Sequence, residues 1–270
     1  MVKLLRIEAI KFWGSPILRA LLIIHFTLFL LIALLAAFAP INIQGVSIEK
    51  LFQFPHAWQT FAWIASWFNL LLGILVIVMV ANEHQYRTYR KQLIDGLSRT
   101  ELLLSKLLAI SIIAVYTTLL VFAAGLIIGF IKTNSFNFSD FISGLSILPV
   151  LFLQSLSYMA LGMLVAFILK NTAMSIVGFV LYFFPIEPII RAFIPAPVDK
   201  FFPFKIISNL TPMPDFFGIA LGDSIQIKGV DGLEIVHPEA SIWGAVVLST
   251  LIYLIGFALV SKLIIDKRNF

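Results

Sequence analysis

The chain has 270 residues, of which 60% are hydrophobic and 12% are charged, with a net charge of +5. Soluble domains contain roughly 45–50% apolar and about 25% charged residues, so a soluble core could not absorb this much apolar surface. The composition therefore indicates an integral membrane protein, and excludes a soluble enzyme, a nucleic-acid-binding protein and a disordered chain. Because there is no cysteine, disulfides, thiolate metal sites and catalytic thiols are also excluded.

Six apolar runs are long enough to cross a bilayer, since a spanning helix needs about 20 such residues. The runs lack the alternating pattern of a membrane β-barrel, and helices are then the way to satisfy the backbone in lipid. The sequence thus predicts an all-α membrane fold, a single domain over 1–270, with six transmembrane helices. Their predicted ranges are 17–38, 60–81, 107–131, 145–169, 173–194 and 242–264.

The distribution of basic residues predicts the orientation of the chain. Thirteen of the 19 Lys and Arg residues fall on the face that carries both termini and the loop after the second span, and six fall on the other face. Cytoplasmic loops carry the excess of Lys and Arg. We therefore expect both termini in the cytoplasm and the large segment 195–241 outside.

Residues 2–15 mix apolar and basic side chains ahead of the first span. This pattern predicts a short amphipathic helix in the inner headgroup plane, with its basic residues toward anionic lipid. The alternative is an ordinary cytosolic tail. The residues concerned are Leu4, Leu5, Ile10 and Trp13, with Lys3, Arg6 and Lys11.

The loop 82–106 predicts a short cytosolic helix over about Glu83–Asp95. Three side chains at helical spacing would be buried anchors against a partner, and basic side chains would occupy the remaining surface. The anchors are Tyr86, Tyr89 and Leu93, and the basic residues are Arg87, Arg90 and Lys91.

Signals for the end of that helix and the start of the next follow directly. Gly96 is the residue type preferred just past a helix end. Ser98 and Glu101 have the spacing of a capping box, which predicts a second helix that continues through Lys106 into the third span.

The outer segment 195–241 contains five prolines before residue 215, which exclude long helices there. Residues 225–236 alternate in polarity and contain Asp231-Gly232, so a small β-hairpin is predicted.

Polar side chains inside the spans are few. His25 could hydrogen-bond a neighbouring helix or line a transport route. Asn69, Gln154 and Tyr158 are uncharged groups of the kind that hold membrane helices together.

Glu187 and Arg191 form the exception, as a charged pair at i,i+4 spacing near the outer end of the fifth span. Pro185 and Pro188 are expected to break the helix there. Broken backbone at membrane depth is tolerated where it is buried in protein or lines a cavity. The element is either a structural kink or an outer gate.

No catalytic signature is present: the sequence has no nucleophile elbow, no paired metal-binding histidines and no phosphate-binding loop. The chain is therefore expected not to be an enzyme, and to bind no cofactor or metal. Any energy for work against a gradient must enter through a partner.

The loop after the second span resembles the cytosolic loop of ABC-2 type transporter permeases. The resemblance rests on Glu83, Tyr86, Arg87, Thr88, Tyr89, Arg90, Leu93, Gly96, Ser98, Arg99, Glu101 and Lys106. In that family an acidic residue ends the second span, a coupling helix follows, and a G-x-S-R-type turn leads into the third span. The amphipathic N-terminal helix, the six spans and the large outer segment before the last span are also similar.

The resemblance implies two permeases, identical or homologous, bound to two cytosolic ABC ATPase subunits in a bacterial cytoplasmic membrane. ATP and Mg²⁺ would bind to the ATPases, and the loop residues above would couple them to the spans. The implied activity is export of a hydrophobic or amphipathic molecule. The alternative is a subunit that transmits force in envelope, motility or maturation complexes without moving cargo.

Two functions outside this family also fit a multi-pass protein. A stand-alone channel or secondary transporter would place coupling charges near the membrane midplane, which this chain lacks. A membrane scaffold or assembly factor would need no ATPase, so co-purification with an ATPase separates it from the permease.

Overall fold

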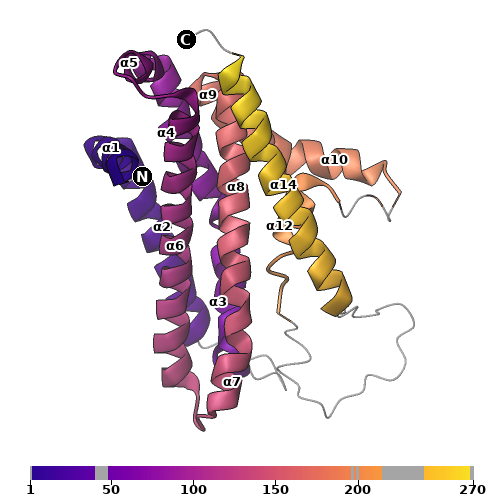
Figure 1. The fold of residues 1–270 in the computed structure, drawn as a ribbon. Helices are drawn as coiled ribbons and strands as arrows, with labels where there is room; N and C mark the ends of the chain where they lie inside the picture. Colours follow the sequence, from indigo (N-terminus) through magenta and orange to yellow (C-terminus); the bar gives the residue numbers. More distant parts are fainter. Residues whose placement is uncertain (1, 40–47, 196–197, 199–200, 215–239, 268–270) are drawn as a thin grey trace.

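The computed structural model describes residues 2–39, 48–195, 198, 201–214 and 240–267. Within these residues the chain is helical and has no strand, which confirms the predicted all-α membrane fold (Figure 1). The predicted hairpin at 225–236 lies outside the described residues. The helices are α1 (Val2–Gly14), α2 (Pro16–Phe38), η1 (Ile48–Phe52), α3 (His56–Ser66), α4 (Asn69–Gln85), α5 (Thr88–Ile94), α6 (Arg99–Lys132), α7 (Phe138–Ser143), η2 (Gly144–Ser146), α8 (Ile147–Leu169), α9 (Thr172–Leu181), η3 (Tyr182–Ile186), α10 (Glu187–Ala192), α12 (Pro203–Ser208) and α14 (Ala240–Asp266).

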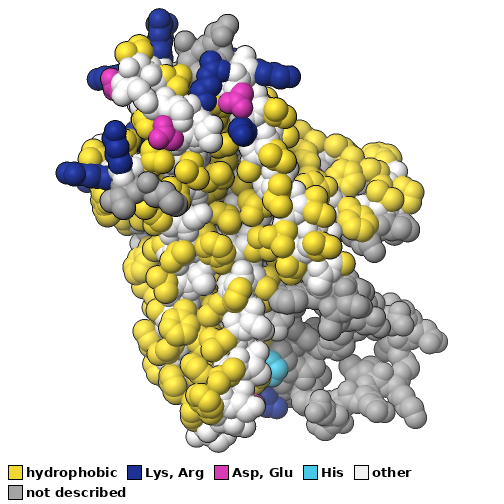
Figure 2. Space-filling view, in the orientation of Figure 1, with side chains coloured by type: hydrophobic (Ala, Val, Ile, Leu, Met, Phe, Trp, Pro, Cys, Tyr) yellow, Lys and Arg dark blue, Asp and Glu magenta, His cyan; other side chains and the backbone are white. Residues whose placement is uncertain are grey.

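Five helical segments of the described chain are long and apolar enough to cross a membrane, and α3 with α4 makes a sixth if the bent pair is one span. The protein is therefore a multi-pass membrane protein. Helix α8 runs alongside both α4 and α6, whereas α1 lies beside the bundle, transverse to these helices, near the end that carries α5 (Figure 1). Figure 2 shows an apolar surface over the middle of the molecule and most of the visible Lys and Arg side chains at the α5 end.

The second span is not the continuous helix that its apolar run predicted. It bends by 44° between α3 and α4. At this point Ser66 donates its hydroxyl hydrogen bond to the carbonyl of Trp63 at 2.7 Å, a local bond that competes with regular helix geometry. Asn69, the first residue of α4, is fully buried, and its side-chain amide donates a hydrogen bond to Gln154 of α8.

Helices α4 and α8 approach closely because glycines face each other. A Cβ atom on Gly162 would lie 2.7 Å from the carbonyl oxygen of Gly73, and a Cβ on Gly73 would lie 2.5 Å from the ring of Phe179. Small residues allow this kind of backbone approach between membrane helices, where dispersion contacts replace the hydrophobic effect. The α4–α8 pair thereby forms the centre of the bundle.

The fifth span contains the irregularity that its prolines predicted. Pro185 lies inside a π-helical turn, η3, and Pro188 lies in the first turn of α10. Proline lacks the backbone N–H that a regular turn would use, and a π turn accommodates this loss. The chain then returns to the bundle through α12, which lies between α8 and α14 at about mid-height (Figure 1).

Candidate functional site

Four charged side chains form a cluster between α1, α4 and α6, in which Glu8, Glu83 and Lys106 are buried and Lys11 is partly exposed. Lys106 has no exposed surface, and its Nζ contacts Oε2 of Glu8 at 2.6 Å and Oε1 of Glu83. Lys11, one turn after Glu8, reaches the same two carboxylates at 2.8 and 3.0 Å. Ser105 donates a further hydrogen bond to Glu8 at 3.2 Å. We call Glu8, Lys11, Glu83 and Lys106 the ion cluster.

The charges of the ion cluster compensate one another, with two carboxylates against two ammonium groups. Burial alone would raise the pKa of Glu8, but the ammonium groups of Lys106 and Lys11 outweigh it, and the pKa lies below its ordinary value. The carboxylate is therefore ionised at neutral pH. Moving α1 away from α4 and α6 would separate these charges and leave buried charges uncompensated, which is costly. The cluster therefore holds α1 against both helices.

Tyr89 of α5 packs against the ion cluster. Its side chain is 2% exposed, and its ring centroid lies 6.2 Å from that of Phe167 and 5.9 Å from Nζ of Lys106. Burial, the negative charges of Glu83 and Glu8 and a hydrogen bond to Glu83 raise the pKa of Tyr89 well above its ordinary value, so the hydroxyl stays protonated. Through Tyr89, α5 is attached to α4, α6 and α8.

The predicted helix over Glu83–Asp95 is divided in the structure. α4 continues to Gln85, and α5 begins only at Thr88, after Arg87 with a left-handed backbone at φ 54°. A left-handed residue cannot continue a right-handed helix, because its Cβ clashes with the following carbonyl. The short α5 is therefore an element separate from the second span.

The predicted helix stop and capping box are confirmed. Gly96 has φ +94°, a conformation that glycine adopts without strain. The Ser98 hydroxyl accepts from the Glu101 N–H at 3.2 Å, and the Glu101 carboxylate accepts from the Ser98 N–H at 2.8 Å. Arg99 donates to the backbone carbonyl of Asp266, which connects the start of α6 to the end of α14.

The outer side of α5 and its preceding turn form an exposed surface that is both apolar and basic. Tyr86 and Ile94 are 75% and 76% exposed. The full set, which we call the α5 surface, is Tyr86, Arg87, Arg90, Lys91 and Ile94.

Of the three predicted anchors, only Tyr86 lies on the α5 surface. Tyr89 is buried inside this chain, and Leu93 is half-buried against its apolar core. The prediction that Tyr89 is an anchor for a partner is thus wrong. Helical spacing marks a shared face, but it does not say whether that face meets a partner or the chain's own spans. Thr88 is half-buried beside Tyr89.

A second polar site lies deep in the bundle, where α12 meets the start of α4. Asn69 donates to Oε1 of Gln154 at 3.1 Å and accepts from Ser155 at 2.8 Å. Gln154 donates to the carbonyl of Ile207 at 3.1 Å and accepts from Thr211 at 3.0 Å. We call Asn69, Gln154, Ser155 and Thr211 the polar network. Since these side chains are buried and bonded to one another, the network holds α12 against α4 and α8.

Glu187 holds the other end of α12. Its side chain is 1% exposed, and its carboxylate accepts from the N–H groups of Lys205 at 2.8 Å and Phe204 at 3.1 Å. The first N–H groups of a helix lack intrahelical partners and favour a negative charge. The i,i+4 spacing of Glu187 and Arg191 did not predict this contact with α12.

His25 and Tyr158 contact neighbouring helices. Nδ1 of His25 in α2 lies 3.5 Å from the hydroxyl of Tyr116 in α6. The ring of Tyr158 in α8 lies 5.5 Å from that of Phe204 in α12. Of the two alternatives for His25, the structure shows the helix contact.

Sequence reasoning missed Glu8 and Thr211 as site residues. A signal was available for Glu8, because Leu4, Glu8 and Phe12 follow one another at i, i+4 and i+8 on one helix face. A charge on an otherwise apolar stripe indicates a buried partner. Thr211 gives no such signal, since its partner Gln154 is 57 positions away.

Comparison with protein families supplies an independent finding. Residues 57–265, from α3 to the end of α14, match the family described as ABC-2 family transporter protein. The match covers more than half of the chain and includes α5, the polar network and α12. A comparison with curated proteins found no match.

Proposed function

The chain belongs to the ABC-2 family of transporter proteins and is a membrane permease of an ABC-type system, and from this premise we propose that it couples ATP hydrolysis in separate ATPase subunits to export of a hydrophobic or amphipathic substrate. Two ATPase subunits and a second permease, identical or homologous, would complete the transporter. ATP and Mg²⁺ would bind to the ATPases. The chain itself would supply the pathway and no catalytic group.

One observation carries the coupling role: the α5 surface is exposed, whereas the opposite side of the same short helix is attached to the ion cluster. Tyr and Arg side chains are among those that carry most of the binding energy at protein interfaces. Tyr89 contacts Lys106, and Lys106 contacts Glu8 and Glu83. A displacement of α5 by a bound ATPase would therefore reach α1, α4 and α6 together.

The orientation follows from the charge distribution. The α5 end carries most of the visible basic side chains, and the positive-inside rule assigns such an end to the cytoplasm (Figure 2). The amphipathic helix α1 and both termini would then lie on the cytoplasmic side of a bacterial inner membrane, with α7 on the outer side.

The gate that the sequence predicted would be built on α12. Glu187 and the polar network hold this short helix at about mid-height between α8 and α14, beside the π turn that contains Pro185 (Figure 1). Irregular backbone at membrane depth is found where it is enclosed by protein or lines a cavity. Glu187, Arg191, Pro185 and Pro188, which the sequence assigned to the outer end of the fifth span, would thus shape the route at about mid-height, by positioning α12 (Figure 1).

Co-purification tests the coupling role. The tagged chain is co-expressed with candidate ABC ATPases from neighbouring genes, and capture of the ATPase is compared for wild type, Ile94→Ala and Arg90→Glu. Thr100→Ala is the control, because Thr100 is exposed at the same end of the molecule but lies on α6. We expect the two α5 variants to lose capture and the control to keep it. Equal capture by all variants would contradict docking at the α5 surface.

A second measurement separates export from force transmission. The reconstituted complex is tested in vesicles for ATP hydrolysis and for ATP-dependent movement of hydrophobic dyes. Hydrolysis with dye movement supports an exporter. Hydrolysis that depends on the α5 surface but moves no cargo would favour the force-transmitting subunit.

A further inference from the structure

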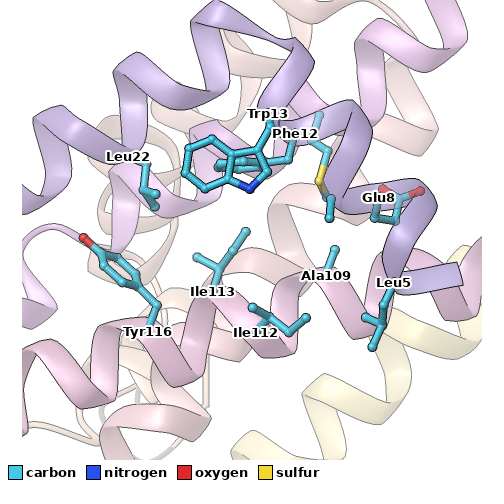
Figure 3. Close-up of a pocket in the computed structure, with 11 residues that line it drawn as sticks. Leu5, Glu8, Phe12, Trp13, Leu22, Ala109, Ile112, Ile113 and Tyr116 are labelled. Carbon is cyan, nitrogen blue, oxygen red and sulfur yellow. The ribbon is translucent and has the colours of Figure 1, made fainter. Parts of the chain in front are cut away.

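A cavity of about 220 Å³ lies between α1 and α6, with α2 and α4 at its sides. Figure 3 shows the rings of Phe12 and Trp13 from α1 on one side and the side chains of Ala109, Ile112 and Ile113 from α6 on the other. Apart from Glu8 and the hydroxyl of Tyr116, the lining side chains are apolar. Since Glu8 is paired with Lys106 and Lys11, it presents no unpaired charge to the cavity.

One wall of the cavity follows the direction of the spans. Its α6 wall consists of Ala109, Ile112, Ile113 and Tyr116, which follow one another at i, i+3, i+4 and i+7. This spacing forms one stripe along two turns, or about 10 Å of helix axis. An apolar wall of this length beside a membrane helix can accommodate part of a hydrocarbon chain.

The α1 side of the cavity combines apolar and basic groups. Trp13, which lines the cavity, is 65% exposed although it is a large apolar side chain. Arg6, also exposed, precedes Ala9 by three positions and Trp13 by seven, so it lies on the helix face that borders the cavity. Because α1 lies across the spans near the α5 end, this face is at the level of the lipid headgroups (Figure 1).

We propose that the cavity binds one acyl chain of an anionic phospholipid from the leaflet on the α5 side, with the lipid phosphate next to Arg6. The chain would contact Phe12, Trp13 and the α6 stripe. The negative headgroup complements Arg6, and the hydrocarbon complements the lining. A bound chain would also exclude water beside Glu8, which strengthens the ion pairs of the cluster. The proposal needs no ATPase and is independent of the coupling role.

Fluorescence quenching by brominated lipids tests the proposal, because Trp13 lines the cavity. The full chain is reconstituted in phosphatidylcholine with a minor fraction of phosphatidylglycerol, and one lipid or the other carries bromine on its acyl chains. The emission of Trp13 is obtained as the difference between each protein and its Trp13→Phe counterpart. At equal bromine content, we expect brominated phosphatidylglycerol to quench Trp13 more than brominated phosphatidylcholine.

Two variants and a matched control locate the effect. Ala109→Phe fills the cavity and should abolish the excess quenching, whereas Ala123→Phe places the same side chain on an exposed position of α6 and should not. Arg6→Gln should reduce the preference about fivefold, since one basic residue near an anionic surface contributes on that order. Equal quenching by the two lipids, or an excess that survives Ala109→Phe, would overturn the proposal.

Discussion

The ammonium group of Lys106 lies 2.6 Å from Oε2 of Glu8, although 98 positions separate the two residues in the chain. The helix that carries Lys106 has 34 residues, about 51 Å at 1.5 Å per residue, and so extends well beyond a hydrocarbon layer of about 30 Å. The ion pair therefore belongs to the part of α6 near the membrane surface, where α1 and α5 meet the spans. It makes the amphipathic helix an integral part of the bundle.

Removing Lys106 should be strongly destabilising. Lys106→Met leaves the carboxylates of Glu8 and Glu83 buried with Lys11 as their remaining cation, and breaking such a buried pair costs about 3–5 kcal/mol. Lys132→Met is the matched control: its ion pair with Glu49 spans 3.8 Å, and the Glu49 side chain is 74% exposed, so the loss should stay below about 1 kcal/mol. Denaturant unfolding in detergent measures both. Similar losses for the two variants would show that the ion cluster contributes no more than a surface pair.

The contribution of Glu8 to stability should depend on pH in one direction. Its pKa in the folded chain lies below the ordinary value of 4.5, because Lys106 and Lys11 outweigh the effect of burial. The folded state therefore binds the proton less readily than the unfolded state, and the stabilisation is present above pH 4.5 and is lost as the pH falls through the folded pKa. The difference in unfolding free energy between wild type and Glu8→Gln should be constant from pH 5 to 8 and shrink at lower pH. A difference that shrinks toward pH 8 would contradict this assignment.

Replacing Tyr89 should lower the stability of the folded chain, whereas replacing Tyr86, three positions earlier, should weaken only ATPase capture. Tyr89→Ala removes a buried aromatic ring and should cost about 3–5 kcal/mol of unfolding free energy. Tyr86→Ala changes an exposed side chain and should stay within about 0.5 kcal/mol. In the proposed complex, Tyr86→Ala should nevertheless weaken capture of the ATPase. Denaturation and co-purification are measured on the same variants, and loss of stability in Tyr86→Ala would show that its ring packs inside the chain.

The features that sequence reasoning predicted are local in the chain. Apolar run length determined the spans, and Gly96 with the Ser98–Glu101 box determined where α6 begins, because those signals involve residues next to one another. The bend before Asn69 was not predicted, since the amide partner Gln154 is 85 positions away. Likewise, helical spacing grouped Tyr89 with Tyr86, but only the distant Phe167 and Lys106 determine that Tyr89 is buried.

The carboxylate of Glu187 accepts hydrogen bonds from the N–H groups of Phe204 and Lys205. Glu187→Leu removes both acceptors and leaves buried donors unsatisfied, at a cost of about 1–3 kcal/mol. Glu187→Gln keeps one acceptor oxygen and should have a smaller effect. Detachment of α12 is measured as maleimide labelling of Ile207→Cys, a buried position in a chain with no native cysteine.

We expect labelling to be fastest with Glu187→Leu, intermediate with Glu187→Gln and slowest with wild-type Glu187. If labelling follows the opening of α12, the same free energy corresponds to an increase of about 5–150-fold for the leucine variant. Arg191→Leu is the comparison, because the sequence alone paired Arg191 with Glu187. If Arg191→Leu exposes Ile207→Cys and Glu187→Leu does not, then the carboxylate is not what holds α12, and its hydrogen bonds to Phe204 and Lys205 are secondary to contacts made by Arg191.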